Sequence, residues 1–234
     1  MMKTLLKILD LVLIVFCFTA CASNKDEVVE ATSGAWLVPV YDYATMAPSS
    51  CGRIQDTVPI NPSKKTVLII GDSISIGYTP LVRQNLDSNV LHNPCNAAYA
   101  GYTSYRIDTW LSEPNYDVIV FNNGLWDGYA SGIHVDQYIS NLRKTALAVK
   151  AKTTRPIFMA TTYSNEIPSS MAKLNQFAVA AQNLMNELGI PVLDLYSVSY
   201  NVRSELVDGT HFTSYGYQVL ANEVSDAIQS QLDL

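Results

Sequence analysis

The pattern of apolar and polar positions becomes regular at Lys65 and stays regular to the end of the chain. Short apolar runs, several of them rich in β-branched residues, alternate there with longer segments whose apolar residues recur every three or four positions. The runs predict buried strands, and the longer segments predict amphipathic helices. The predicted strands are Thr66–Ile70, Asn89–His92, Asp117–Asn122, Pro156–Thr161 and Pro191–Leu195.

Three of the longer segments carry a clear apolar stripe with helical spacing. One runs from Val135 to Val149, and another runs from Tyr217 to Ile228. The third, Met171–Leu188, is followed by Gly189, a residue type that commonly ends a helix. Strands that alternate with helices predict a parallel sheet covered on both faces. About five strands fit an α/β fold of the flavodoxin-like type, a three-layer α/β/α sandwich. Ligands bind beyond the carboxyl ends of the strands in such folds, so residues that directly follow strands are the first candidates for a site.

The N-terminus has the features of an export signal. Lys3 and Lys7 precede an apolar run, Leu11–Phe18, which is shorter than the ~20 residues that a membrane-spanning helix needs. The run closes with Phe18-Thr19-Ala20-Cys21, which resembles the lipobox of bacterial lipoproteins. We therefore expect cleavage before Cys21 and a lipid on its sulfur. An ordinary secretory signal with a chance cysteine is the alternative.

Three regions follow from this pattern. Residues 1–20 form a lipoprotein signal peptide, and residues 21–64 contain the lipidated cysteine, a tether and a lead-in segment with one short strand at Ala35–Val40. Residues 65–234 form the folded domain. The protein is expected to be exported and anchored by lipid to the cell envelope, with the outer membrane preferred because Ala22 is not a typical inner-membrane retention signal.

Composition and charge exclude several kinds of partner. Hydrophobic residues make up 48% of the 234 residues and charged residues 15%, which argues against disorder. The formal charge of −6 becomes −7 once residues 1–20 are removed, because 13 basic and 20 acidic residues remain of the original 15 and 21. This acidic balance disfavours nucleic acid as a partner and electrostatic attachment to anionic lipid. The lipid on Cys21 is therefore the only membrane contact that we expect.

Two cysteines, Cys51 and Cys95, remain after Cys17 is removed with the signal peptide and Cys21 is lipidated. An oxidising compartment permits a disulfide between them, but their spacing leaves open whether they pair. The three histidines do not have the spacing of a metal site, and no cofactor is expected.

Candidate chemistry begins directly after the first strand, at Gly71-Asp72-Ser73. A serine at a strand-to-helix turn directs its hydroxyl away from the sheet edge, and its backbone N–H lies at a helix N-terminus that favours an oxyanion. Asp and Ser are also common helix N-caps, so three residues alone leave both interpretations open. The Gly-x-Ser-x-Gly elbow of α/β-hydrolases is absent.

A matching base and carboxylate lie near the C-terminus, in Asp208-Gly209-Thr210-His211. A serine hydroxyl is a poor nucleophile until a base takes its proton, and the base works best when a carboxylate orients it. A tight turn with Asp at its first position and His at its fourth can present both groups on one side. His92, in the second strand, and His134, at a helix start, are less suitable.

Two further segments offer hydrogen-bond donors for an oxyanion. The polar segment Asn96–Ser104, predicted to be a loop after the second strand, contains Gly101, whose backbone N–H is a candidate donor. The third strand ends in Asn122 and Asn123, and either side-chain amide is a second candidate. Each donor of this kind stabilises a transition state by roughly 3 kcal/mol.

These segments together resemble the SGNH/GDSL hydrolases over about residues 66–232. Gly71–Ser73 matches the first family block, Gly101 matches the glycine of the second, and Asp208 with His211 matches the fifth. The third block departs from the common Gly-x-Asn-Asp: it is Phe-Asn-Asn-Gly-Leu-Trp-Asp, similar to a Phe-Asn-x-Gly-Leu-x-Asp variant in some members.

The resemblance implies a role for each matching residue. Ser73 is the implied nucleophile, His211 the base and Asp208 its partner. The implied oxyanion donors are the Ser73 N–H, Gly101 and one asparagine. Asn122 is preferred because the variant block fixes the first asparagine, and Asn123 stays open.

The resemblance implies a serine esterase that works through an acyl-enzyme, and an O-acetylesterase acting on carbohydrate outside the cytoplasm is the first expectation. The partner is then an acylated, mainly acetylated, small molecule or glycan. A lysophospholipase, thioesterase or aryl-esterase of the same family is one alternative, and a non-catalytic glycan-binding lipoprotein is another. Several aromatic residues flank the candidate segments and suit either sugar binding or packing at the sheet rim: Tyr78, Tyr99, Tyr102, Tyr105, Trp126, Tyr129 and Tyr215.

Overall fold

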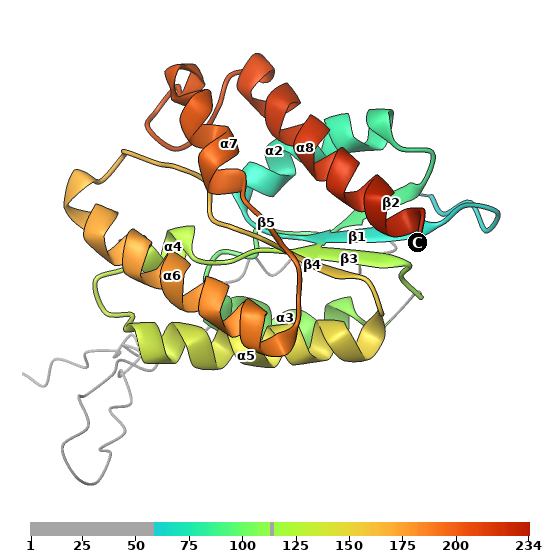
Figure 1. Cartoon of the computed structure of the whole chain (residues 1–234), viewed down its shortest axis with the longest axis horizontal. Helices are drawn as coiled ribbons and strands as arrows, with labels where there is room; N and C mark the ends of the chain where they lie inside the picture. The colour runs from blue at the N-terminus through green and yellow to red at the C-terminus, as the bar shows by residue number, and fades with distance from the viewer. Residues whose placement is uncertain (1–58, 113–114) are drawn as a thin grey trace, which may run out of the picture.

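The computed structural model describes residues 59–112 and 115–234. Within them, five parallel strands form one sheet in the order β2-β1-β3-β4-β5 (Figure 1). The strands are β1 (Thr66–Ile70), β2 (Asn89–His92), β3 (Val118–Phe121), β4 (Pro156–Met159) and β5 (Val192–Leu193). This strand order confirms the expected flavodoxin-like α/β/α architecture.

Helices cover both faces of the sheet. Figure 1 shows α2, α7 and α8 on one side, and α3, α5 and α6 on the other. The helices are α2 (Ser73–Asn85), α3 (Ala100–Trp110), α4 (Leu125–Tyr129), α5 (Val135–Lys152), α6 (Met171–Leu188), α7 (Leu195–Asn201) and α8 (Ser214–Leu232). Two 3-10 turns, η2 (Pro168–Ser170) and η3 (Arg203–Glu205), complete the set in the described residues.

The alternation of side chains along β1 explains why the sheet needs cover on both sides. Val67 and Ile69 pack with α2 and α8, whereas Leu68 and Ile70 pack with α3, α5 and α6. All four side chains are fully buried. A strand that is buried on both faces has a continuous run of apolar residues, and the sequence of β1 has this pattern.

Several predicted strands are shorter in the structure than in the sequence pattern. Asp117 precedes β3, and its Oδ2 accepts a hydrogen bond from the N–H of Thr66, the first residue of β1, at 2.8 Å. At the other end, Asp194 caps α7 by accepting from the Ser197 N–H at 3.0 Å, so Leu195 begins a helix and is not part of a strand.

The segment around Gly101, predicted to be a loop, is instead the start of α3. Its sequence contains Gly, Thr and Ser, which have low helix propensity. Tertiary packing against α5 and burial of Ile107 and Trp110 in the core stabilise the helix. The short helices α4 and α7 were also not predicted, since neither is long enough to show a periodic stripe.

The predictions for the signal peptide, the lipidated cysteine, the tether and the strand at Ala35–Val40 lie outside the described residues. The same holds for Cys51, while Cys95 is disulfide-bonded. In the described part of the chain, no helix has the length and apolar character needed to cross a membrane.

Candidate active site

Ser73 lies where β1 gives way to α2, at the carboxyl edge of the sheet. The preceding residue, Asp72, is the N-cap of α2, and its Oδ1 accepts a hydrogen bond from the Ile74 N–H at 3.0 Å. Because Asp72 provides the cap, the hydroxyl of Ser73 is available for another partner. That partner is His211, whose Nε2 lies 2.9 Å from Ser73 Oγ. The structure thus separates the two roles that the sequence left open for this segment.

His211 is oriented by Asp208 through two hydrogen bonds. Asp208 Oδ2 lies 2.7 Å from His211 Nδ1, and Asp208 Oδ1 accepts from the backbone N–H of His211 at 2.7 Å. These bonds, together with one from the Thr210 N–H, lower the pKa of the Asp208 carboxyl to about 2. An ionised carboxylate only accepts hydrogen bonds, so Nδ1 carries the imidazole proton and Nε2 is left to accept the Ser73 proton.

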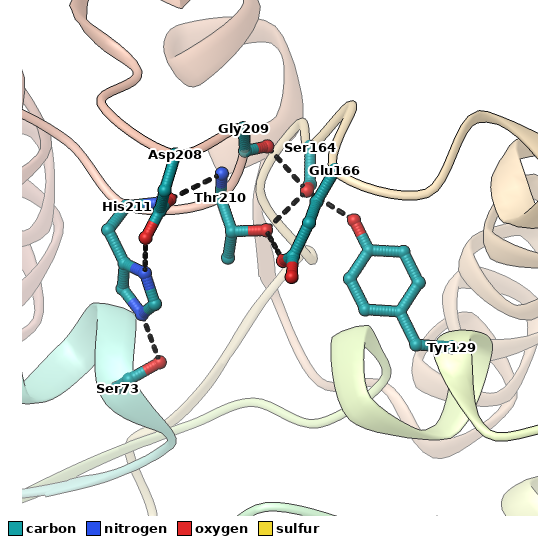
Figure 2. A network of polar contacts seen from close by, with 8 residues as sticks. All are labelled: Ser73, Tyr129, Ser164, Glu166, Asp208, Gly209, Thr210 and His211. Carbon is teal, nitrogen blue, oxygen red and sulfur yellow. Dashed lines mark hydrogen bonds and ion pairs between the residues drawn. The ribbon is translucent and has the colours of Figure 1, made fainter.

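Ser164 bonds to the turn that carries Asp208 and His211, at Gly209 and Thr210, as Figure 2 shows. The Ser164 side chain is buried, and its Oγ donates to the Gly209 carbonyl at 2.7 Å. It also lies 2.7 Å from Thr210 Oγ1 and contacts the hydroxyl of Tyr129. Ser164 is far from the turn in sequence and belongs to no local motif, so sequence reasoning missed it.

Gly209 is required at the centre of this turn. Its φ of +89° is in the left-handed region that favours glycine, and a Cβ there would lie 2.9 Å from the backbone of Glu166. The backbone N–H of Asn165 donates to the Gly209 carbonyl at 2.8 Å, which ties the two loops together.

The two asparagines after β3 have different surroundings. Asn123 is 1% exposed, and its Nδ2 donates to Thr103 Oγ1 at 2.9 Å and to the Ala98 carbonyl at 3.2 Å. The side-chain amide of Asn122 has no hydrogen-bond partner among the described residues: its Oδ1 is buried without one beside Gly71, where an added Cβ would be 2.5 Å away. Asn122 is therefore the asparagine whose amide group is available.

Gly101 occupies the second position of α3 and is buried. A backbone N–H in the first turn of a helix has no acceptor within the helix, so a donor is present at this position. Just before it, the Ala100 N–H donates to both carboxylate oxygens of Asp127, at 3.1 and 3.0 Å. Asp127 thus anchors the start of α3, a role that the sequence pattern did not indicate.

Ser73 and His211 open onto a cavity of about 370 Å³. Gly101, Asn122 and Asn123 are not part of its wall, although all three lie beyond the carboxyl ends of β2 and β3. Aromatic side chains form one side, where the rings of Tyr99 and Trp126 meet edge to face at 5.6 Å. The cavity is lined by Ser73, Tyr99, Leu125, Trp126, Tyr129, Ala130, Glu166, Thr210 and His211. Of the other aromatics singled out in the sequence, Tyr78 and Tyr102 are core residues, and Tyr105 and Tyr215 are exposed.

A second serine–histidine contact among the described residues is buried in the core. His92 Nε2 lies 2.6 Å from Ser75 Oγ, and His92 Nδ1 lies 2.6 Å from the Asn93 carbonyl. Burial lowers the pKa of His92 to about 4, so its ring is neutral and links β2 to α2. His134 is exposed at the start of α5. Neither histidine reaches the cavity.

Groups of three or more His, Cys, Asp or Glu side chains able to hold a metal ion are absent from residues 59–112 and 115–234. The polar groups around Ser73 are instead arranged as one hydrogen-bonded chain, from Ser73 through His211 to Asp208. Such a chain can move a proton between a serine hydroxyl and an imidazole.

Comparisons with known proteins agree with this fold. No family model matches the sequence, and no curated protein matches it. Among solved structures, an acetylxylan esterase from Geobacillus stearothermophilus has a TM-score of 0.61 and 17% identity over 70% of this chain and 94% of its own. The lipase/acylhydrolase from Enterococcus faecalis has a TM-score of 0.63 and 19% identity, over 71% and 96%. An alpha/beta hydrolase enzyme from the metagenome of Lake Arreo, Spain, has a TM-score of 0.62 and 14% identity, over 71% and 96%. The chain has the α/β fold of these enzymes.

The buried Asp127 makes stability depend on pH. Burial raises its pKa from 3.8 to about 7, and the nearby Asp72 acts in the same direction, whereas the Ala100 N–H and Lys173 oppose the rise. A carboxyl with a raised pKa in the folded state favours folding below pH 3.8, and this contribution is lost as the pH rises toward 7. The wild type should therefore lose stability from pH 5 to pH 8, whereas Asp127→Asn should not lose this contribution. We expect the free energy of unfolding of Asp127→Asn, minus that of the wild type, to be about 2–3 kcal/mol larger at pH 8 than at pH 5.

Urea denaturation of both proteins at the two pH values measures this difference. Asp226→Asn, at an exposed position of α8, is the matched control and should show no such pH-dependent gain. Parallel behaviour of Asp127→Asn and the wild type would show that the Asp127 carboxyl is ionised in the folded protein at both pH values.

Proposed function

We propose that this chain is a serine hydrolase of the SGNH/GDSL kind, and that it cleaves carboxylic esters through an acyl-enzyme on Ser73. The observation that carries the proposal is the hydrogen-bonded chain from Ser73 Oγ through His211 to Asp208 at the wall of a cavity. The shared fold with an acetylxylan esterase and a lipase/acylhydrolase supports it.

The geometry supports a sequence of proton and acyl transfers in two stages. In the first stage, Ser73 Oγ attacks the ester carbonyl carbon while its proton passes to His211 Nε2 over the 2.9 Å contact. Asp208 stabilises the imidazolium that forms. The tetrahedral intermediate collapses, His211 gives the proton to the departing alcohol oxygen, and the acyl group stays on Ser73.

In the second stage, His211 takes a proton from a water molecule, and the resulting hydroxide attacks the acyl carbon. The C–O bond to Ser73 breaks, the proton returns to Ser73 Oγ, and the carboxylic acid leaves. The negative charge that develops on the carbonyl oxygen in both stages needs fixed donors. We assign this role to the Ser73 N–H at the start of α2, the Gly101 N–H in α3 and the free amide of Asn122.

The alcohol part of the ester is proposed to be a carbohydrate, and the acyl group an acetyl. A cavity of about 370 Å³ suits a short acyl chain with a ring beside it, and the aromatic side chains of Tyr99, Trp126 and Tyr129 in its wall suit contact with a sugar. The acetylxylan esterase with the same fold supports this choice.

We also propose that the enzyme acts outside the cytoplasm, held to the cell envelope by a lipid on Cys21. This proposal rests on the sequence of residues 1–21 alone: the basic start, the short apolar run and the lipobox-like Phe-Thr-Ala-Cys. An extracellular position fits a glycan substrate.

Substitution of the proposed nucleophile tests the chemistry. Ser73→Ala should lower kcat for 4-nitrophenyl acetate by at least about 10³-fold, and His211→Ala should lower it to a similar extent. The double variant should be little worse than either single one, because the two residues act as one unit. Initial rates of 4-nitrophenol release at saturating substrate measure these effects.

The matched control for these rates is Ser230→Ala, a serine on the exposed side of α8. It should hydrolyse 4-nitrophenyl acetate like the wild type. If Ser73→Ala kept full activity, the nucleophile assignment would be wrong, and if wild-type protein showed no activity on any ester, the binding-protein alternative would be favoured.

The two asparagines should respond differently to replacement by alanine. Asn122→Ala should lower kcat by about 10²–10³-fold with little change in the urea midpoint, because its amide is available to the oxyanion. Asn123→Ala should lower the urea midpoint, since its buried amide links Thr103 to the Ala98 carbonyl. Rates and denaturation curves of both variants measure the contrast. An unchanged kcat in Asn122→Ala would remove this residue from the oxyanion site.

A further inference from the structure

The cavity beside Ser73 has one acidic side chain in its wall, that of Glu166. Neither Lys nor Arg is among the described residues that line it. The remaining wall consists of aromatic, apolar and hydroxyl-bearing side chains together with His211. A bound ester therefore meets a single fixed negative charge in addition to the groups that perform the chemistry.

Among the described residues, one of the two Glu166 carboxylate oxygens has a hydrogen-bond partner. Oε2 accepts a hydrogen bond from the Thr210 hydroxyl at 2.5 Å, which fixes the carboxylate beside the His211 turn (Figure 2). Oε1 has no hydrogen-bond partner among the described residues. A carboxylate oxygen with open acceptor capacity in a binding cavity is a site for a donor on the ligand.

Holding the catalytic turn does not require Glu166. Ser164 already fixes the turn, since its buried Oγ bonds to the Gly209 carbonyl and contacts Thr210 Oγ1. The carboxylate of Asp208 ties the Thr210 and His211 N–H groups from the other side. Glu166 is exposed, whereas Ser164 is buried. The bonds of Ser164 and Asp208 hold the turn without the bond to Glu166.

Glu166 also fixes the direction of one hydroxyl proton in this network. A carboxylate accepts only, so the Thr210 hydroxyl donates to it. The single proton of the Ser164 hydroxyl goes to the Gly209 carbonyl, which leaves the Ser164 oxygen to accept from the Tyr129 hydroxyl. Glu166 and Tyr129 therefore belong to the same group of hydrogen-bonded side chains, and both line the cavity.

We propose that Glu166 is the residue that selects the alcohol part of the ester. Its free Oε1 accepts a hydrogen bond from a hydroxyl group of a neutral polyol such as a sugar ring, and its charge disfavours alcohols that carry an anion. The proposal rests on the ester hydrolysis proposed above and narrows its substrate class to esters of uncharged, hydroxyl-rich alcohols. Esters of uronates or of phosphate-bearing alcohols are then poor substrates.

Two physical effects set the expected size of the selection. A hydrogen bond to a charged group is stronger than one between neutral groups, so its loss should reduce relative turnover of a sugar ester about tenfold. A like charge in a partly exposed site repels an anionic ligand, and removing that charge should improve turnover of an anionic ester about three- to tenfold.

The test uses three acetyl esters with the same acyl group and different alcohols. An acetylated xylo-oligosaccharide supplies hydroxyl groups, 4-acetoxybenzoate supplies a carboxylate, and 4-nitrophenyl acetate supplies neither. The values of kcat/KM are measured for the wild type, Glu166→Ala, Glu166→Gln and Glu223→Gln. Glu223 is exposed on α8, so its variant has the same change in net charge as Glu166→Gln without touching the cavity.

The ratio of kcat/KM between esters is the readout, because it cancels any general effect on the catalytic turn. We expect the ratio of oligosaccharide to 4-nitrophenyl acetate to fall about tenfold in Glu166→Ala. We expect the ratio of 4-acetoxybenzoate to 4-nitrophenyl acetate to rise about three- to tenfold in Glu166→Gln. Glu223→Gln should leave both ratios at the wild-type values.

The outcomes separate this inference from the function on which it rests. An active wild type whose Glu166 variants lose activity on all three esters in the same proportion would make Glu166 a support for the turn and overturn the inference alone. A 4-acetoxybenzoate ratio that rises equally in Glu223→Gln would assign the effect to net charge and also overturn it. A wild type inactive on all three esters would overturn the proposed function, and the inference with it.

Discussion

The hydrogen bond between Ser73 Oγ and His211 Nε2 joins residues 138 positions apart in the chain, and the rest of the site depends on that contact. The parallel sheet makes the contact possible, because all strands point the same way and their carboxyl ends share one edge. Ser73 starts a helix at that edge, and the turn carrying His211 precedes α8 on the same face as α2. The packing of α2 against α8 therefore sets the distance between the Ser73 hydroxyl and the His211 imidazole.

Ser73 and His211 can bond to each other because the neighbouring polar groups have other hydrogen-bond partners. Asp72 caps α2, which frees the Ser73 hydroxyl, and Asp208 holds His211 Nδ1, which leaves Nε2 as the acceptor. Ser164 fixes the turn from behind without entering the cavity wall. This division leaves Glu166 with one free carboxylate oxygen toward the ligand. The proposed hydrolysis and the proposed selection of the alcohol thus fall to different residues of one connected network.

Much of this arrangement could be predicted from the sequence, for specific reasons. The first strand is predictable because it is a buried, mainly apolar run, and the second because Val90 and Leu91 are apolar at its centre. Short local patterns indicate Ser73, Asp208 and His211. The helix at Ala100–Trp110 could not be predicted, since packing against α5 rather than local propensity forms it. Ser164 and Glu166 reach the site from a loop after β4, and no spacing in the sequence connects that loop to the turn at Asp208. Asn122 and Asn123 could be told apart only by their hydrogen bonds.

Covalent labelling by an alkyl fluorophosphonate shows whether His211 activates the Ser73 hydroxyl, since this reagent transfers its phosphonyl group to an activated serine and releases fluoride. Intact mass measurement followed by peptide mapping locates the adduct. We expect one adduct per chain, on Ser73, and its loss in His211→Ala, because the imidazole is needed to remove the serine proton. An adduct on a different serine, or equal labelling of the wild type and His211→Ala, would contradict it.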